Sequence, residues 1–289
     1  MSRKNSHSSN DMRVGRGVGA FFINAILIIF SFSCIFPLIW MFYSSLKEKR
    51  AFQLDIISLP AKPTFDNYVA VANDRDAHIW TALLSSFRTT VFAVLLIIVF
   101  GYVLGYLLGR LKFRGSKIFS LLLLLGLLIP IHSLLVPIYV VFNRLGIGDK
   151  WYTLIIPYVA FGLPIAVFLI HGYVLSVPKE FEEAAAIDGY GFVRTMFSIL
   201  LPICMPILVT VAIIQTFACW NEFSFALVLI NNINYKTVPL AMTQFTGQFN
   251  SNYPKMMAAM LLTMAPVVLF YFLFSKKIIE GMVAGAIKG

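Results

Sequence analysis

Residues 84–108 form the stretch LSSFRTTVFAVLLIIVFGYVLGYLL, in which Arg88 is the only charged residue. A helix needs about 20 mostly apolar residues to cross a bilayer. Hydrophobic residues make up 59% of the whole chain and charged residues 12%, about half the roughly 25% charge of an ordinary soluble domain. A soluble fold must cover its core with polar surface, so this composition favours a protein embedded in lipid.

Five further runs have the same character. They cover residues 18–43, 118–142, 152–175, 203–230 and 256–274. Membrane-spanning strands would show two-residue alternation, which these runs lack, so each is predicted to be a helix. The first run is too long for the apolar part of a signal peptide and is expected to stay as an anchor. The predicted fold class is therefore an all-α polytopic membrane protein with about six transmembrane helices.

Basic residues between the runs predict how the chain is oriented. The connection between the second and third runs, the N-terminal tail of residues 1–17 and the C-terminal tail of residues 276–289 are all rich in Lys and Arg. Cytoplasmic loops carry this excess, so both termini and residues 177–202 are predicted to be cytoplasmic. Residues 44–83 are then extracytoplasmic, with short surface helices expected, for instance around 65–71. Because the net charge of +10 lies in short segments, membrane lipid is a better partner for it than nucleic acid.

Several kinds of catalytic or binding chemistry find no support in the sequence. The three cysteines lie inside apolar runs, and the four histidines form no metal-like cluster. No phosphate-binding G-x-x-x-x-G-K-[ST] loop is present, nor a serine nucleophile elbow. We therefore expect no enzyme activity and no bound cofactor in this chain.

Residues 177–202, between the fourth and fifth runs, predict a helix–turn–helix element outside the bilayer. Pro178 suits a first helical turn, and the acids Glu180, Glu182 and Glu183 complement the positive end of the helix dipole. Gly189 is well placed to end the helix in a left-handed cap. A second helical stretch, residues 192–200, then leads to Pro202.

One face of the first helix carries Phe181, Ala184, Ala185 and Asp188 at helical spacing. Small Ala side chains allow close approach of another backbone, and Glu183 offers a charge to a cationic partner. Periodicity alone is equally compatible with an amphipathic connector between two spans.

The order Glu183-Ala184-Ala185, Gly189 and Ile199-Leu200-Leu201-Pro202 resembles the EAA loop of ABC-importer permeases that work with a binding protein. Asp188 before the glycine is also usual in that loop. Other segments resemble the maltose-transporter inner-membrane family, specifically its six-span partner. These are PLIWMFYSSLK at 37–47, Asn67-Tyr68, residues 109–115, Trp220-Asn221-Glu222 and residues 284–289. Departures are mild: Ile287 replaces a commoner Val, and Ser85-Ser86 replaces an Asn-Ser pair.

The resemblance implies a permease core over residues 84–275 in a bacterial-type plasma (inner) membrane. With a second homologous permease it would form the path for a sugar or oligosaccharide delivered by an extracellular solute-binding protein. The EAA helix would dock on a cytoplasmic ABC ATPase dimer, with Glu183 facing a basic residue, and the ATPase would bind ATP–Mg. The tail residues Gly285, Lys288 and Gly289 are possible further contacts with the ATPase.

Polar residues inside the membrane are hypotheses for function. Glu222, with Trp220 and Asn221, is predicted either to line the path or to hold a neighbouring helix. Two other functions remain open on the sequence. One is an ABC permease for a non-sugar solute, and the other is an ion-coupled secondary transporter, a class that tends to show repeats and midplane carboxylates. A purely structural membrane anchor would leave the EAA-like loop unexplained.

Overall fold

The computed structural model describes residues 6–74, 78–111, 113–245 and 252–286, with side chains from residue 20 to residue 274 within these ranges. Every regular element in the described residues is helical. The chain divides into two compact units. One unit contains Met1–Val71 with Asn250–Leu261, and the other contains Ala72–Phe249 with Leu262–Gly289.

The first unit begins with α1 (Ser6–Ser45), of which Ala20–Ser45 is apolar and long enough to cross a membrane. The short helices α2 (Lys49–Leu54) and α3 (Asp66–Ala72) follow. The amide of Asn67 in α3 donates to the carbonyls of Ser45 and Lys47, both at 2.8 Å. The expected surface helix near residues 65–71 is thus confirmed, and its position is fixed by hydrogen bonds to the end of α1.

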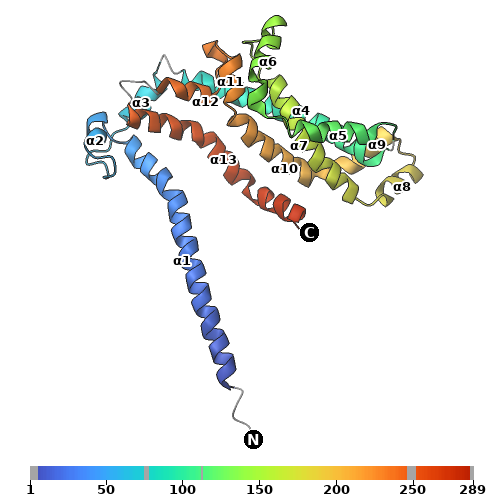
Figure 1. Ribbon diagram of the computed structural model, residues 1–289, viewed down its shortest axis with the longest axis horizontal. Coiled ribbons are helices and arrows are strands. Elements are labelled where there is room, and N and C mark those ends of the chain that lie inside the picture. The colour runs from blue at the N-terminus through green and yellow to red at the C-terminus, as the bar shows by residue number, and fades with distance from the viewer. Residues whose placement is uncertain (1–5, 75–77, 112, 246–251, 287–289) are drawn as a thin grey trace. The chain divides into compact units, whose positions relative to one another are not determined.

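The second unit is built on three long helices that run side by side (Figure 1): α4 (Ile79–Arg110), α7 (Ile155–Ser176) and α10 (Leu201–Trp220). Ile97, Ile170 and Leu200 are fully buried where these helices meet. Small residues bring α4 and α7 together, as expected for helices that associate in lipid without a strong hydrophobic drive. The predicted span 84–108 lies within α4, and the predicted span 152–175 nearly coincides with α7.

The third predicted span is not one continuous helix. It consists of α5 (Ser116–Gly126) and α6 (Ile131–Arg144), which are bent by 100° relative to each other. Pro130 has no N–H for the carbonyl of Gly126 and keeps the residue before it out of helical geometry. The N–H groups of Leu127 and Leu128 bond only three residues back, to Leu124 and Leu125, so α5 ends in a tight turn.

The fifth predicted span, residues 203–230, is displaced toward the N-terminus in the structure. Helix runs without a break from α9 (Phe192–Thr195) through a π-helical turn (Met196–Leu200) into α10, giving the candidate span Phe192–Trp220. The sequence suggested that the helical stretch 192–200 stops at Pro202, but in the structure the helix continues through it. Pro202 lies inside this continuous helix, just after the π turn, and local π adjustments of this kind accommodate proline in membrane helices.

Short elements connect α10 to the last helix. They are α11 (Ser224–Leu229), a 3-10 turn (Ile233–Tyr235), α12 (Val238–Met242) and a second 3-10 turn (Thr243–Phe245). The final helix, α13 (Tyr253–Ala286), contains the candidate span Tyr253–Phe274, close to the predicted run 256–274. Within the residues that the structure describes, five helices are long and apolar enough to cross a membrane, or six if the bent pair α5–α6 counts as one span.

Candidate functional site

The segment between α7 and α10 contains the helix α8 (Glu180–Ile187), which lies at one end of the second unit (Figure 1). The N–H groups of Glu182 and Glu183 donate to the carbonyl of Lys179, at 2.9 and 3.0 Å. Three acids occupy the first turn of α8, where they complement the positive end of the helix dipole. The helix begins at Glu180 with Lys179 as its N-cap, so Pro178 lies just before the helix rather than in its first turn.

Gly189 ends α8 in a left-handed conformation, with φ of +78°. The N–H of Gly189 donates to the carbonyl of Ala186 at 3.1 Å, and the N–H of Tyr190 donates to that of Ala185 at 2.9 Å. These two bonds define a Schellman motif, which requires one residue with positive φ after the helix. The glycine cap expected from the sequence is confirmed. The guanidinium of Arg194 lies 4.1 Å from the centre of the Tyr190 ring and stabilises the turn that follows.

The two faces of α8 differ sharply in exposure. Ala185 is buried, while Ala184 and Glu183 are exposed. Phe181 and Ile187 are also exposed, at 48% and 87%. Of the four residues on the predicted face, Phe181, Ala184 and Asp188 are exposed and only Ala185 is buried. Ala185 follows Glu182 by three residues and shares its inward side. The outward side carries the acids Glu180 and Glu183 together with Ala184 and Ile187.

A buried ion pair attaches the inward face of α8 to the last turns of α4. Nε of Arg110 and the hydroxyl of Tyr106 both donate to Oε1 of Glu182, each at 3.0 Å. Nη2 of Arg110 also donates to the carbonyl of Val177, at 2.7 Å. The side chains of Arg110 and Glu182 are 4% and 21% exposed. We call this group the α4–α8 clamp (Tyr106, Arg110, Val177 and Glu182).

The clamp was not predicted from the sequence. Arg110 is one of the basic residues after the second run, which indicated only orientation, and Glu182 was assigned only to the helix dipole. A signal was available, because Tyr106 and Arg110 are four residues apart and so share one face of a long apolar helix. Polar groups on a shared helix face inside a membrane protein call for a common partner.

The second half of the segment packs against the bundle. Met196 and Leu200 are buried, Ile199 is half-buried and Pro202 is exposed. The hydroxyl of Tyr102 in α4 donates to the carbonyl of Met196 at 2.6 Å, and the same carbonyl also accepts the N–H of Leu201 at the end of the π turn. α4 thus contacts both halves of the segment between α7 and α10.

Trp220, Asn221 and Glu222 lie at the opposite end of α10. Trp220 is buried, and Nδ2 of exposed Asn221 donates to the carbonyl of Phe217 at 3.0 Å. Glu222 accepts the N–H of Phe225 at 2.7 Å and the hydroxyl of Tyr158 at 3.0 Å. Glu222 therefore caps the start of α11, and its hydrogen bond with Tyr158 connects this cap to α7. Whether any of the three lines the solute path stays a prediction.

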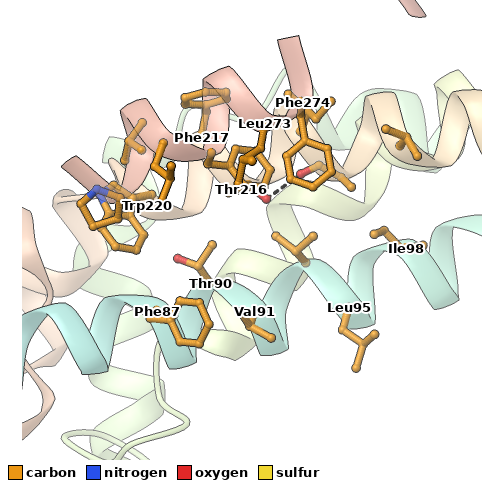
Figure 2. Close-up of a pocket in the computed structure, with 18 residues that line it drawn as sticks. Phe87, Thr90, Val91, Leu95, Ile98, Thr216, Phe217, Trp220, Leu273 and Phe274 are labelled. Carbon is orange, nitrogen blue, oxygen red and sulfur yellow. Dashed lines mark hydrogen bonds between the residues drawn. The ribbon is translucent and has the colours of Figure 1, made fainter. Parts of the chain in front are cut away.

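Figure 2 shows an apolar cavity between α4, α10 and residues 266–274 of α13. Its volume is about 540 Å³. Trp220 and Phe217 line it from α10, Phe87 from α4 and Phe274 from α13. The hydroxyl of Thr216 bonds to the carbonyl of Ala212 in its own helix at 2.7 Å. A hydroxyl-rich solute would lose its hydrogen bonds to water here without replacement, so the cavity does not suit a sugar.

The remaining predicted contacts lie at the C-terminus. Gly285 belongs to the last turn of α13, whereas Lys288 and Gly289 lie outside the described residues. Across the part of the chain that the structure describes, no three His, Cys, Asp or Glu residues gather as a metal site would require.

Comparisons with known proteins place this architecture among transport proteins. Residues 101–282 match the family described as "Binding-protein-dependent transport system inner membrane component". A putative ABC transporter permease protein, ORF2 of Caldicellulosiruptor sp. (strain Rt8B.4), is 35% identical over 88% of this chain and 91% of its own length. The trehalose/maltose transport system permease protein MalG of Thermococcus litoralis is 31% identical over 91% of this chain and 94% of its own length.

A solved structure shares the fold. It is the crystal structure of a bacterial ABC transporter involved in the import of the acidic polysaccharide alginate. The likeness has a TM-score of 0.79 at 22% identity, and it covers 95% of this chain and 99% of that one.

Proposed function

Since the chain belongs to the family of binding-protein-dependent transport system inner membrane components, and is a multi-pass inner-membrane transport subunit, we propose that it is the permease of a sugar importer. A second, homologous permease would complete the membrane path with it. An extracellular binding protein would deliver the solute, and a separate ABC ATPase dimer would bind ATP–Mg and drive the cycle.

The outward surface of α8 carries this proposal. Phe181, Ala184 and Ile187 present apolar area beside the charge of Glu183, on a helix that is fixed to the bundle by its other face. Exposed apolar area rimmed by polar residues marks interaction sites. We propose that this surface docks in a cleft of the ATPase, with Glu183 facing a basic residue, and that the C-terminal tail adds a weaker contact.

The α4–α8 clamp explains how docking would move the membrane helices. A ligand shifts a conformational equilibrium only when it binds one state better than the other. The ATPase would hold α8 differently in its open and closed forms. Because Glu182 is bonded to Arg110 and Tyr106, displacement of α8 would pull on the end of α4.

The names of the relatives support a sugar as the solute. They include permeases for trehalose or maltose, for arabinooligosaccharides and for diacetylchitobiose. The apolar cavity of the second unit is no site for such solutes, so we place the sugar contacts elsewhere in the path, including the second permease. A non-sugar solute is the alternative, and uptake assays with a panel of saccharides would separate the two.

The distribution of Lys and Arg supports cytoplasmic termini and a cytoplasmic α8. Arg110, Arg114 and Lys117 all lie near the connection between α4 and α5. Positive-inside bias predicts that this connection faces the cytoplasm, on the same side as α8. A membrane-impermeant thiol reagent applied to a cysteine at Glu183 in intact cells would test this, since labelling from outside would contradict it.

Glu183→Ala is the main test, with Glu48→Ala as the control for loss of an exposed acid. Glu183 is exposed in the first turn of α8, whereas Glu48 is exposed just before α2. A hydrogen bond to a charged group is worth about 1.5–3 kcal/mol, so loss of Glu183 is expected to weaken ATPase binding about tenfold or more. Uptake and co-purification of the ATPase should fall for Glu183→Ala, while its membrane insertion and the uptake of the Glu48→Ala variant stay near wild type. Undiminished ATP-dependent uptake by Glu183→Ala would refute the docking role. Uptake that follows an ion gradient without ATP would favour a secondary transporter.

A further inference from the structure

The loop after α2 has an arrangement opposite to that of an ordinary water-exposed loop. Four large apolar side chains point outward and are exposed by half or more of their surface: Leu54 at 82%, Ile56 at 51%, Ile57 at 72% and Leu59 at 73%. Loops in water usually expose polar side chains and leave their backbone groups to the solvent. We call residues 54–59 the apolar loop.

Two carbonyl groups of the apolar loop are bonded to side chains near the end of α1. The indole N–H of Trp40 donates to the carbonyl of Ile56 at 3.0 Å. The hydroxyl of Tyr43 donates to the carbonyl of Ile57 at 2.6 Å. Two consecutive carbonyls are thus satisfied by side chains rather than by water.

Asp55 satisfies the N–H groups of the same loop. Its carboxylate accepts from the N–H of Ile57 at 3.0 Å and from that of Ser58 at 3.1 Å. Both bonds lower the pKa of Asp55, and the bond from Ser58 has the larger effect. Asp55 therefore stays ionised at neutral pH. Lys47, itself buried, donates to the carbonyl of Asp55 at 2.9 Å. The one charged side chain of the loop is therefore engaged in holding its turn together.

The position of the loop along α1 is set by Trp40 and Tyr43. Both lie near the end of the candidate span Ala20–Ser45, whose 26 residues extend about 39 Å as a helix. The hydrocarbon core is about 30 Å thick, so the last turns of this span reach the headgroup region. Trp and Tyr are enriched at that boundary. The apolar loop is bonded to both residues and so lies at the same level.

We propose that the apolar loop inserts its four large side chains into the boundary between headgroups and acyl chains of the bilayer, at the C-terminal end of α1. Backbone groups that leave water must be satisfied within the protein. In this loop, protein groups bond the carbonyls of Asp55, Ile56 and Ile57 and the N–H groups of Asp55, Ile57 and Ser58. Insertion into lipid requires only an apolar surface, whereas a protein interface combines an apolar centre with polar contacts at its rim. The apolar side chains of this loop therefore favour lipid. The inference goes beyond transport and requires only that α1 crosses the membrane.

Nitroxide labels at single cysteines would test the insertion. Ile57→Cys and Leu59→Cys are made in a chain whose three native cysteines are replaced by Ala. Lys62→Cys is the control, because Lys62 is exposed on the polar segment that follows the loop. The full chain, purified with its transport subunits, is placed in vesicles of phosphatidylcholine and phosphatidylglycerol. Collision rates of each label are then measured with oxygen, which enters lipid, and with a water-soluble nickel chelate.

The expected result is a ratio of oxygen to nickel collisions above that of free label at 57 and 59, and below it at 62. A high nickel rate at 57 would show that the loop faces water and would overturn the proposal. Low rates with both reagents at 57 would show that protein, either the second permease or the binding protein, covers the loop, and would overturn it equally. An Ile57→Trp variant gives a second readout, since its fluorescence should be quenched by lipids brominated near the headgroup. Lack of quenching would also contradict insertion.

Discussion

Replacing Glu182 by Met would leave Arg110 buried without a counter-charge. Glu182 receives two donors on the same oxygen, Nε of Arg110 and the hydroxyl of Tyr106, each at 3.0 Å. The side chain of Arg110 is only 4% exposed and cannot reach water where it lies. Breaking a buried ion pair from one side costs about 3–5 kcal/mol, because the remaining charge stays desolvated. We expect Glu182→Met to lower the free energy of unfolding by about this amount.

The opposite variant, Arg110→Met, is expected to cost less, about 1–3 kcal/mol. Glu182 is 21% exposed and can gain water when Arg110 is removed, although the carbonyl of Val177 loses a donor at 2.7 Å. Tyr106→Phe removes a hydrogen bond to the charged carboxylate of Glu182 and should cost about 1.5–3 kcal/mol. The double variant with Met at both positions leaves no unpaired charge and should be less destabilised than the sum of the single variants, by about 0.5–3 kcal/mol.

The measurement is a double-mutant cycle on the purified chain in bicelles, unfolded with a denaturing detergent. Glu180→Met, an exposed acid in the same turn of α8, is the control and should change stability by less than about 0.5 kcal/mol. The double variant should insert and bind the ATPase, yet transport less solute for each ATP hydrolysed. Additive single effects, or a double variant with full transport per ATP, would refute the role given to the clamp.

Two glycines give further tests of the structure. Gly189→Ala should cost about 1–2 kcal/mol because φ is +78° there, and Gly189→Asn should cost less since Asn tolerates the left-handed region; thermal unfolding of the complex would measure both. Equal losses for the two variants would contradict the left-handed cap. Gly105→Ala should cost about 1–3 kcal/mol, since its Cβ would lie 2.8 Å from Cγ2 of Ile170, while Gly172→Ala meets nothing within 4 Å and should be neutral. A stable Gly105→Ala variant would argue against the close packing of α4 on α7.

The number and type of the long helices could be predicted from the sequence, because lipid imposes the length and apolarity of each span. The breaks could not. Pro37, Pro164, Pro206 and Pro266 all lie inside continuous helices, whereas Pro130 separates α5 from α6. The effect of a proline depends on whether neighbouring groups satisfy the carbonyl it frees, and that information is tertiary.

The candidate site divides in the same way between local and distant causes. The cap at Gly189 follows from residues within one turn, so the sequence was sufficient to predict it. The bond between Arg110 and Glu182 joins residues 72 positions apart. The spacing of Tyr106 and Arg110 indicates a shared partner, but no local pattern identifies Glu182 as that partner. Periodicity placed Ala185 on the docking face because it could not tell which side of α8 meets α4.

A helix that transmits force needs one face that is held and one that is free, and α8 has both. In the proposed docking role, its free face, with Glu183, would determine which partner binds and how tightly, since only differential affinity shifts the cycle. Its held face, with Glu182, would determine how far the motion of a bound partner reaches α4. Loss of Glu183 should therefore release the ATPase, whereas loss of the clamp should leave an ATPase that stays bound and hydrolyses ATP without matching transport. On this proposal, two adjacent acids in one helical turn have separate roles, Glu183 in assembly and Glu182 in transmission.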